Sequence, residues 1–250
     1  MKMTAAENLL AAYPKTRPPL PDAIREIYDR QFLENRSGAT QASSLAQRLE
    51  GWMHRQVAAD VREGVRGATL ELGAGTLNQL GHEPMVGEYD IVEPFETAYL
   101  GQPGLARIRT AYPDIAAVPA ERRYRRITTI AALEHVCDLP VVLARAALLL
   151  EPDGELRAAI PAEGGFLWTL GWSLTTGLEF RLRHGLNYGD LMRHEHVNQA
   201  REIEALAKAL FEDVSVKSFG LGRQLSLYRF FTASKPRLGV ARAWLARYAA

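Results

Sequence analysis

The stretch over residues 68–76 reads Ala68-Thr69-Leu70-Glu71-Leu72-Gly73-Ala74-Gly75-Thr76. An apolar run containing one acid ends there in two glycines at alternate positions, which is typical of a buried strand followed by a tight turn. Glycine tolerates positive φ and lets a ligand approach bare backbone. We expect the turn to lead into a helix N-terminus, whose free N–H groups attract acceptor oxygens. The stretch therefore predicts a ligand site at the end of a first parallel strand.

The spacing of the glycines separates two classes of cofactor. A dinucleotide-binding turn has a third glycine that lets helix and strand pack closely, but Asn78 occupies that position here. Glu71 precedes the glycines instead, and the resulting Glu-x-Gly-x-Gly resembles the first motif of class I S-adenosylmethionine-dependent methyltransferases. The resemblance implies that Gly73, Ala74 and Gly75 offer backbone to the methionine end of the cofactor. Glu71 would hold the cofactor's ammonium group directly or through water; the alternative is a strand-end acid with purely structural hydrogen bonds.

A second acid stands at the expected distance. Glu93 ends the predicted strand over residues 89–93, 22 residues after Glu71. An acid at the tip of the second strand can accept hydrogen bonds from both ribose hydroxyls, as in dinucleotide-binding folds. We assign Glu93 to the ribose and count the next residue, Pro94, in the same cofactor-binding set. A solvent-facing strand-end glutamate is the alternative.

Further along, residues 114–119 read Asp114-Ile115-Ala116-Ala117-Val118-Pro119. They resemble the family's Asp-Ala-x-x-Leu-Pro segment, in which the acid meets the adenine amino group and the next backbone N–H meets the ring. The resemblance implies that Asp114 and Ile115 hold adenine. An aspartate that favours a turn after Pro113 is the alternative.

The fourth predicted strand, residues 124–133, leads into Leu133-Glu134-His135-Val136. This run resembles the family's Leu-Glu-His-Val, which faces both cofactor and substrate, and we add Ala131 to the cofactor-binding residues. The start of the strand departs from the family, because Tyr124-Arg125 stands where many members have Phe-Asp. Four arginines lie around this start. We expect them to be exposed to solvent; a surface that binds an acidic partner is the alternative. They are Arg122, Arg123, Arg125 and Arg126.

Three histidines are the candidate catalytic residues. A histidine suits removal of a proton from an acceptor hydroxyl because its pKa lies near neutrality. His135 follows the fourth strand, and His194 and His196 flank Glu195 after an aromatic stretch. In an extended segment both would point the same way, with Glu195 opposite. A polar cluster that caps a helix starting at Asn198 is the alternative, and we predict no catalytic metal because no third ligand can be placed.

Seven strands are predicted, and the last two are joined so tightly at Gly220 and Gly222 that they must be antiparallel. The family resemblance implies a doubly wound α/β fold: a seven-stranded, mostly parallel sheet with one antiparallel edge strand and helices on both faces. The resemblance covers residues 66–232, which we assign as the methyltransferase domain with a substrate-binding insertion at 161–197. We assign residues 1–65 as an N-terminal helical cap and residues 233–250 as a tail. The predicted strands are residues 68–72, 89–93, 105–110, 124–133, 155–160, 213–217 and 225–231.

Composition narrows the function. The 250 residues carry a net charge of +1, which argues against bulk binding to nucleic acid or an anionic membrane. Cys137 is the single cysteine, which fits a reducing cytoplasm. We therefore expect a cytoplasmic enzyme that transfers a methyl group from S-adenosylmethionine to a small-molecule acceptor, with a hydroxyl favoured. The alternatives are a nicotinamide (NAD)-dependent oxidoreductase and a non-catalytic cofactor-binding module, and the sequence does not indicate the oligomeric state.

Overall fold

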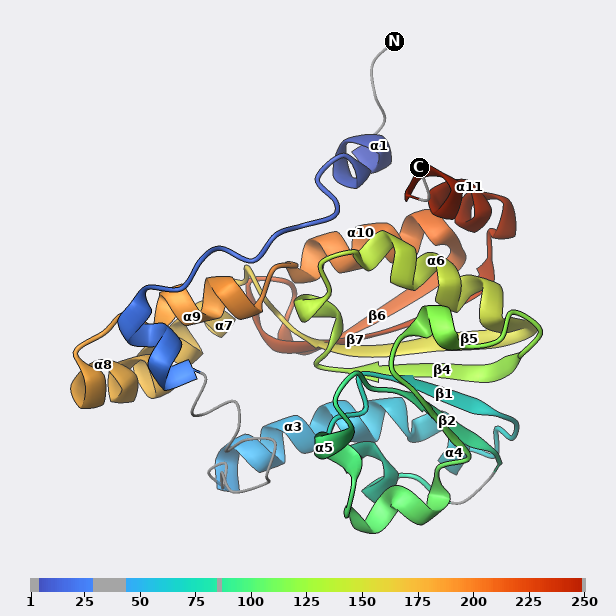
Figure 1. Cartoon of the computed structure of the whole chain (residues 1–250), viewed down its shortest axis with the longest axis horizontal. Coiled ribbons are helices and arrows are strands. Elements are labelled where there is room, and N and C mark those ends of the chain that lie inside the picture. Colours follow the sequence, from blue (N-terminus) through green and yellow to red (C-terminus); the bar gives the residue numbers. More distant parts are fainter. Residues whose placement is uncertain (1–4, 29–43, 85–86, 249–250) are drawn as a thin grey trace.

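This computed structural model describes residues 5–28, 44–84 and 87–248 (Figure 1). Seven strands form one sheet in the order β3-β2-β1-β4-β5-β7-β6. This arrangement, with helices on both faces, confirms the predicted α/β class. The strands are β1 (Thr69–Leu72), β2 (Tyr89–Val92), β3 (Thr110–Tyr112), β4 (Tyr124–Ile130), β5 (Leu150–Pro161), β6 (Phe211–Leu221) and β7 (Leu225–Pro236).

Strand β1 lies inside the sheet, parallel to β2 on one side and β4 on the other. Leu72, its last residue, is in register with Val92 and with Thr129. The carboxyl ends of these three strands therefore meet at one edge, where parallel α/β sheets bind their ligands.

The single antiparallel strand is β7, and it pairs with both β5 and β6. It therefore lies one place in from the edge, and β6 is the edge strand. Both strands are also longer than predicted, because the ladder between them runs from Phe211 opposite Pro236 to Leu221 opposite Leu225.

Helices cover both faces of the sheet (Figure 1). On one face, Met53 and Val57 of α3 (Ser44–Val57) pack against Phe230 of β7, and α4 (Ala59–Arg62) follows. The main core lies on the other face, where Leu143 and Trp244 share one cluster. No described helix has the length and apolarity needed to cross a bilayer. The core-face helices are α6 (Leu139–Leu149), α10 (Ala200–Leu210) and α11 (Leu238–Tyr248), with α1 (Ala5–Leu10) beside them.

Several predicted boundaries were wrong. Residues 105–109 do not form a strand: a 3₁₀ helix, η2 (Pro103–Arg107), stands there, and β3 starts at Thr110. The strand predicted over 155–160 begins earlier, at Leu150. Residues 151–154 form an irregular part of β5, because Tyr124 pairs with Leu150 while Arg126 pairs with Glu155. The helix expected to be capped by Asn198 is capped one residue later by Gln199, which exchanges hydrogen bonds with Glu202.

The chain outside the sheet also differs from its predicted division. The predicted tail is the end of β7 followed by α11, with Trp244 buried in the main core. Of the predicted N-terminal cap, residues 1–4 and 29–43 lie outside the described residues. The preceding segment runs past α10 towards the insertion (Figure 1), and Lys15 forms an ion pair with Glu202 of α10 at 2.7 Å.

Candidate functional site

The glycine turn after β1 has the backbone that its residues predicted. Gly73 and Gly75 have φ of 71° and 50°, which non-glycine residues rarely adopt. A Cβ on Gly73 would lie 2.6 Å from the Cβ of Ala132, so the turn packs bare backbone against the end of β4. A helix does follow the turn, but it is brief. The turn leads into η1 (Asn78–Gly81), a single 3₁₀ turn.

Glu93 holds the glycine turn against the second strand. Its Oε2 accepts a hydrogen bond from the Gly75 N–H at 2.8 Å, and its Oε1 accepts one from the Phe95 N–H at 3.1 Å. Glu93 is 7% exposed, yet it lines a cavity. Two donors therefore fix its orientation, while each oxygen keeps capacity to accept a second hydrogen bond.

That cavity has a volume of about 790 Å³ and lies at the carboxyl ends of β1, β2 and β4. Seven of the predicted cofactor residues and two of the predicted catalytic histidines line it. Three predicted residues do not: Glu71, Ala74 and His196. The predicted residues that do line it are Gly73, Gly75, Glu93, Pro94, Asp114, Ile115, Ala131, His135 and His194.

Asp114 and Ile115 stand together at one wall of the cavity. Asp114 caps the short 3₁₀ helix η3 (Ile115–Ala117), where its Oδ1 accepts a hydrogen bond from the Ala116 N–H at 2.6 Å. The capping bond occupies one oxygen of an exposed carboxylate. The other oxygen, Oδ2, accepts no hydrogen bond from the residues that the structure describes, so it is available to a ligand.

Ala131 stands directly after β4 with φ of 48°. For a residue with a Cβ this left-handed conformation is costly and marks a backbone held in place by its surroundings. Its N–H is bound to the carbonyl of Ala159 on β5 at 2.8 Å. The chain therefore turns sharply at the cavity wall.

Glu71 lies behind the turn rather than in the cavity. It is 2% exposed and accepts a hydrogen bond from the Tyr89 hydroxyl at 2.9 Å. Burial raises the pKa of its carboxyl group to about 8, although the Tyr89 bond acts in the opposite direction. The structure therefore places Glu71 where it supports β1 and β2, and its contact with a ligand stays a prediction.

His135 lies at the cavity wall within a network of charges. Its Nδ1 is 3.0 Å from the carbonyl oxygen of Glu195 and 3.2 Å from that residue's Oε2. Burial alone would lower the pKa of His135, but the hydrogen bond to Glu195 and the charges of Glu134 and Glu195 raise it overall. Burial alone would raise the pKa of Glu195. The hydrogen bonds to His135 and Tyr28 and the charges of His135 and Arg17 lower it instead, to about 2.

The insertion is helical, which corrects the extended geometry expected for His194 and His196. It folds into α7 (Phe166–Trp172), a π-helical turn η5 (Ser173–Gly177), α8 (Leu178–His184) and α9 (Tyr188–Glu195). At the end of α9 the two rings diverge. His194 Nδ1 lies 2.7 Å from the Pro18 carbonyl oxygen, whereas His196 Nδ1 lies 2.7 Å from Glu163 Oε2.

Two residues of the N-terminal segment complete the cavity, and the sequence prediction missed them. Arg17 donates to the carbonyl oxygens of His135, His194 and Glu195, and the Tyr28 hydroxyl donates to the Glu195 carboxylate. The prolines around Arg17 are typical of an extended segment, but nothing in their spacing indicates where that segment lies. The segment thus ties the end of α9 to the loop after β4.

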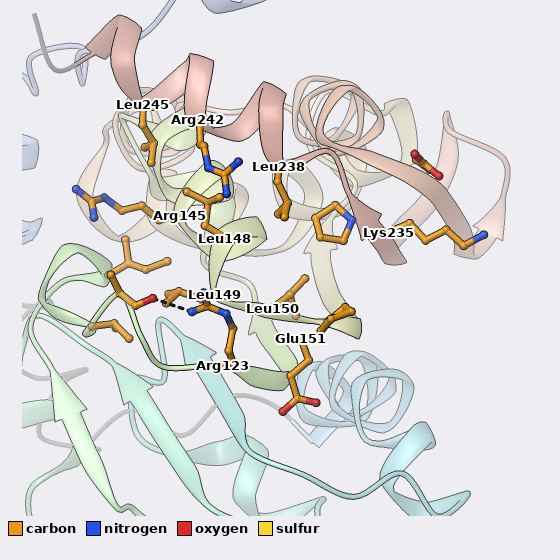
Figure 2. Close-up of a pocket in the computed structure, with 16 residues that line it drawn as sticks. Arg123, Arg145, Leu148, Leu149, Leu150, Glu151, Lys235, Leu238, Arg242 and Leu245 are labelled. Atoms are coloured by element: carbon orange, nitrogen blue, oxygen red, sulfur yellow. Dashed lines mark hydrogen bonds between the residues drawn. The ribbon is translucent and has the colours of Figure 1, made fainter.

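A second cavity, of about 720 Å³, lies at the amino ends of β4 and β5 (Figure 2). Apolar residues of α6 and α11 form its floor, and the side chains of Arg123, Arg145 and Arg242 project around it. It contains neither the glycine turn nor an acid at the carboxyl end of a parallel strand; its acids, Glu151 and Glu212, lie at the amino ends of β5 and β6. The cavity that Glu93 lines is therefore the candidate cofactor site.

The sequence matches no family model and no curated protein. Solved structures do match the fold. An O-methyltransferase family protein from Burkholderia thailandensis is 14% identical, with a TM-score of 0.54 over 91% of this chain and 66% of its own. The CurJ carbon methyltransferase is 18% identical, with a TM-score of 0.56 over 86% and 61%.

A third matching structure is 1,6-didemethyltoxoflavin-N1-methyltransferase from Burkholderia thailandensis, solved with 1,6-didemethyltoxoflavin and S-adenosylhomocysteine. It is 17% identical, with a TM-score of 0.56 over 87% of this chain and 92% of its own. The chain spans less than two thirds of the length of the first two proteins. The likeness shows that this chain has the fold of class I S-adenosylmethionine-dependent methyltransferases.

Proposed function

We propose that this protein transfers a methyl group from S-adenosylmethionine to a small-molecule acceptor. One observation carries the proposal: Glu93 bridges the glycine turn and the tip of β2 while lining a cavity of about 790 Å³. A fixed carboxylate at that position suits a ribose diol. The N–H of Gly75 already has a partner, so the turn is organised before any ligand arrives.

The chain's own residues fit the other parts of this cofactor. Gly73 offers backbone at the point where a side chain would clash with Ala132, which suits the methionine tail. Asp114 Oδ2 suits an adenine amino group as an acceptor, and Phe95, 43% exposed at the same cavity, supplies a ring face. When bound, S-adenosylmethionine supplies a methyl group on a positively charged sulfur, already activated for displacement.

The protein's task is then to align an acceptor and remove its proton. Alignment alone can lower a barrier by roughly 7–11 kcal/mol. We propose a hydroxyl acceptor because the cavity wall carries imidazoles rather than a lysine. In this proposal His135 or Glu195 receives the proton, with His196 behind them, while His194 at the rim contacts the acceptor. The three matching structures are named as O-, C- and N-methyltransferases. The proposal that the acceptor atom is a hydroxyl oxygen is therefore argued from this chain's side chains alone.

The NAD-dependent alternative is disfavoured by the backbone after the glycine turn. A dinucleotide's pyrophosphate binds at a helix N-terminus, and η1 is a single 3₁₀ turn. The non-catalytic alternative predicts cofactor binding without transfer. We expect the reaction to take place in the cytoplasm, as the single cysteine suggests.

Thermal unfolding with S-adenosylhomocysteine or NAD⁺ at equal concentration tests the cofactor. A ligand present at a hundredfold excess over Kd stabilises by about 2.7 kcal/mol. We expect S-adenosylhomocysteine alone to raise the melting temperature; stabilisation by NAD⁺ alone would refute the proposal. Transfer is then tested with isotopically labelled donor methyl and a metabolite extract, followed by mass analysis. Binding without any labelled product would favour the non-catalytic module.

A further inference from the structure

The carboxylate of Glu134 is buried beside the cavity without enough partners. It is 1% exposed, and its Oε2 has no hydrogen-bond partner among the described residues. Its other oxygen, Oε1, lies 3.8 Å from Nε2 of His135, which is too long for a hydrogen bond. A buried carboxylate oxygen without a partner is energetically unfavourable, so a ligand bound to this oxygen would be stabilising.

Two imidazoles stand next to this carboxylate. The rings of His135 and His196 pack edge to face with their centroids 4.9 Å apart. One ligand atom from each of Glu134, His135 and His196 lies within 4.8 Å of the other two. Zinc binds nitrogen and oxygen at roughly 2.0–2.2 Å, so the three ligand atoms would move closer together around a bound ion.

Both imidazoles are oriented by carboxylates on their outer side. Nδ1 of His135 faces Glu195 at 3.2 Å, and Nδ1 of His196 faces Glu163 at 2.7 Å. Glu163 is fixed in turn by the indole N–H of Trp168, at 2.6 Å. A carboxylate on the outer nitrogen is the usual partner of a metal-binding histidine, because it fixes the ring and leaves Nε2 as the ligand.

We infer that Glu134, His135 and His196 form a binding site for a divalent transition-metal cation of the zinc type. Two histidines and one carboxylate leave coordination positions open, as in catalytic zinc sites. His135 lines the cavity, so an open position is accessible from the proposed acceptor side. Resting on the proposed function, the cation would polarise the acceptor hydroxyl. His135 and His196 would then hold the cation, and the hydroxyl proton would pass to Glu195, the other proton acceptor proposed above, which lines the same cavity.

The test uses the tag-free full chain, stripped with EDTA, dialysed and titrated with Zn²⁺ by calorimetry. We expect one Zn²⁺ per chain, confirmed by elemental analysis after gel filtration, and at least tenfold weaker binding in Glu134→Gln and His196→Asn. His194→Asn is the matched control, because this neighbouring imidazole bonds to Pro18 instead and its loss should leave Zn²⁺ affinity unchanged. Absence of stoichiometric Zn²⁺, or wild-type affinity in both ligand variants, would overturn the inference.

Two further measurements separate this inference from the proposed function and from folding defects. Co²⁺ added to the unaltered chain should give the visible absorption of a nitrogen- and oxygen-bound ion; a spectrum identical to that of free Co²⁺ would refute the site. S-adenosylhomocysteine binding without Zn²⁺ binding would reject the metal site and leave the function standing. Zn²⁺ binding without S-adenosylhomocysteine binding would support the site and reject the function.

Discussion

The backbone N–H of Gly75 donates a 2.8 Å hydrogen bond to the carboxylate of Glu93. This bond joins the turn after β1 to the tip of β2, two elements that are adjacent in the sheet but separated by 18 residues of sequence. The carboxylate therefore has a structural role before any cofactor binds. Its substitution should affect both the shape of the turn and the affinity for ligand.

Glu93→Ala should weaken S-adenosylhomocysteine binding by about ten- to a hundredfold, since hydrogen bonds to a charged group contribute roughly 1.5–3 kcal/mol each. Calorimetric titration measures the loss. Glu96→Ala is the control, because that acid lies three residues further along in α5 (Glu96–Tyr99) and is outside the cavity. Equal affinities of wild type and Glu93→Ala would rule out the ribose role.

The two glycines of the turn should respond differently to alanine. Both have positive φ, which costs an alanine roughly 1 kcal/mol. Gly73→Ala would in addition place its Cβ 2.6 Å from Ala132, whereas nothing lies within 4 Å of a Cβ at Gly75. We expect Gly73→Ala to lower the free energy of unfolding more than Gly75→Ala, as measured by urea denaturation. The reverse order would show that the turn rearranges.

How far the sequence predicted the site depended on whether a residue's partner was nearby in the chain. Gly73, Glu93 and Asp114 could be placed because strand ends in a parallel sheet converge on one edge. The relation between His135 and His196 could not, since it depends on α9 ending beside the loop after β4. An aromatic stretch without a clear helical period gave no basis for that docking.

The arginines before and within β4 show the same limit. They were predicted to be solvated, but Arg126 is 1% exposed and is among the largest fully buried side chains. It forms ion pairs with Asp60 at 2.7 Å and with Glu83 at 2.9 Å. Both acids come from outside the sheet, and no local pattern pairs them with this arginine.

Arg126→Met should lower the free energy of unfolding by roughly 3–5 kcal/mol, because it removes the ion-pair partner of buried Glu83 and leaves buried Asp60 with Arg157 alone, at 3.3 Å. Arg122→Met is the matched control: Arg122 is exposed, and exposed substitutions usually stay within about 0.5 kcal/mol. Urea denaturation of the three proteins measures both effects. A loss in Arg126→Met no larger than that of the control would show that Asp60 and Glu83 find other partners.

Stability should depend on pH through Glu71. Its pKa is about 8 in the folded chain and about 4.3 when unfolded, so the folded state keeps a proton that the unfolded state releases. The stability contributed by the protonated form is fully present below the unfolded pKa and is lost as pH rises through the folded pKa. Glu71→Gln cannot ionise, so its free energy of unfolding relative to wild type should rise with pH, by up to about 1.4 kcal/mol per pH unit between pH 5 and 8.

Urea denaturation at pH 5.5, 6.5 and 7.5 measures the difference, and Glu96→Gln on α5 controls for the loss of one exposed negative charge. A Glu71→Gln difference that stays constant across this range would mean that Glu71 is ionised in the folded protein.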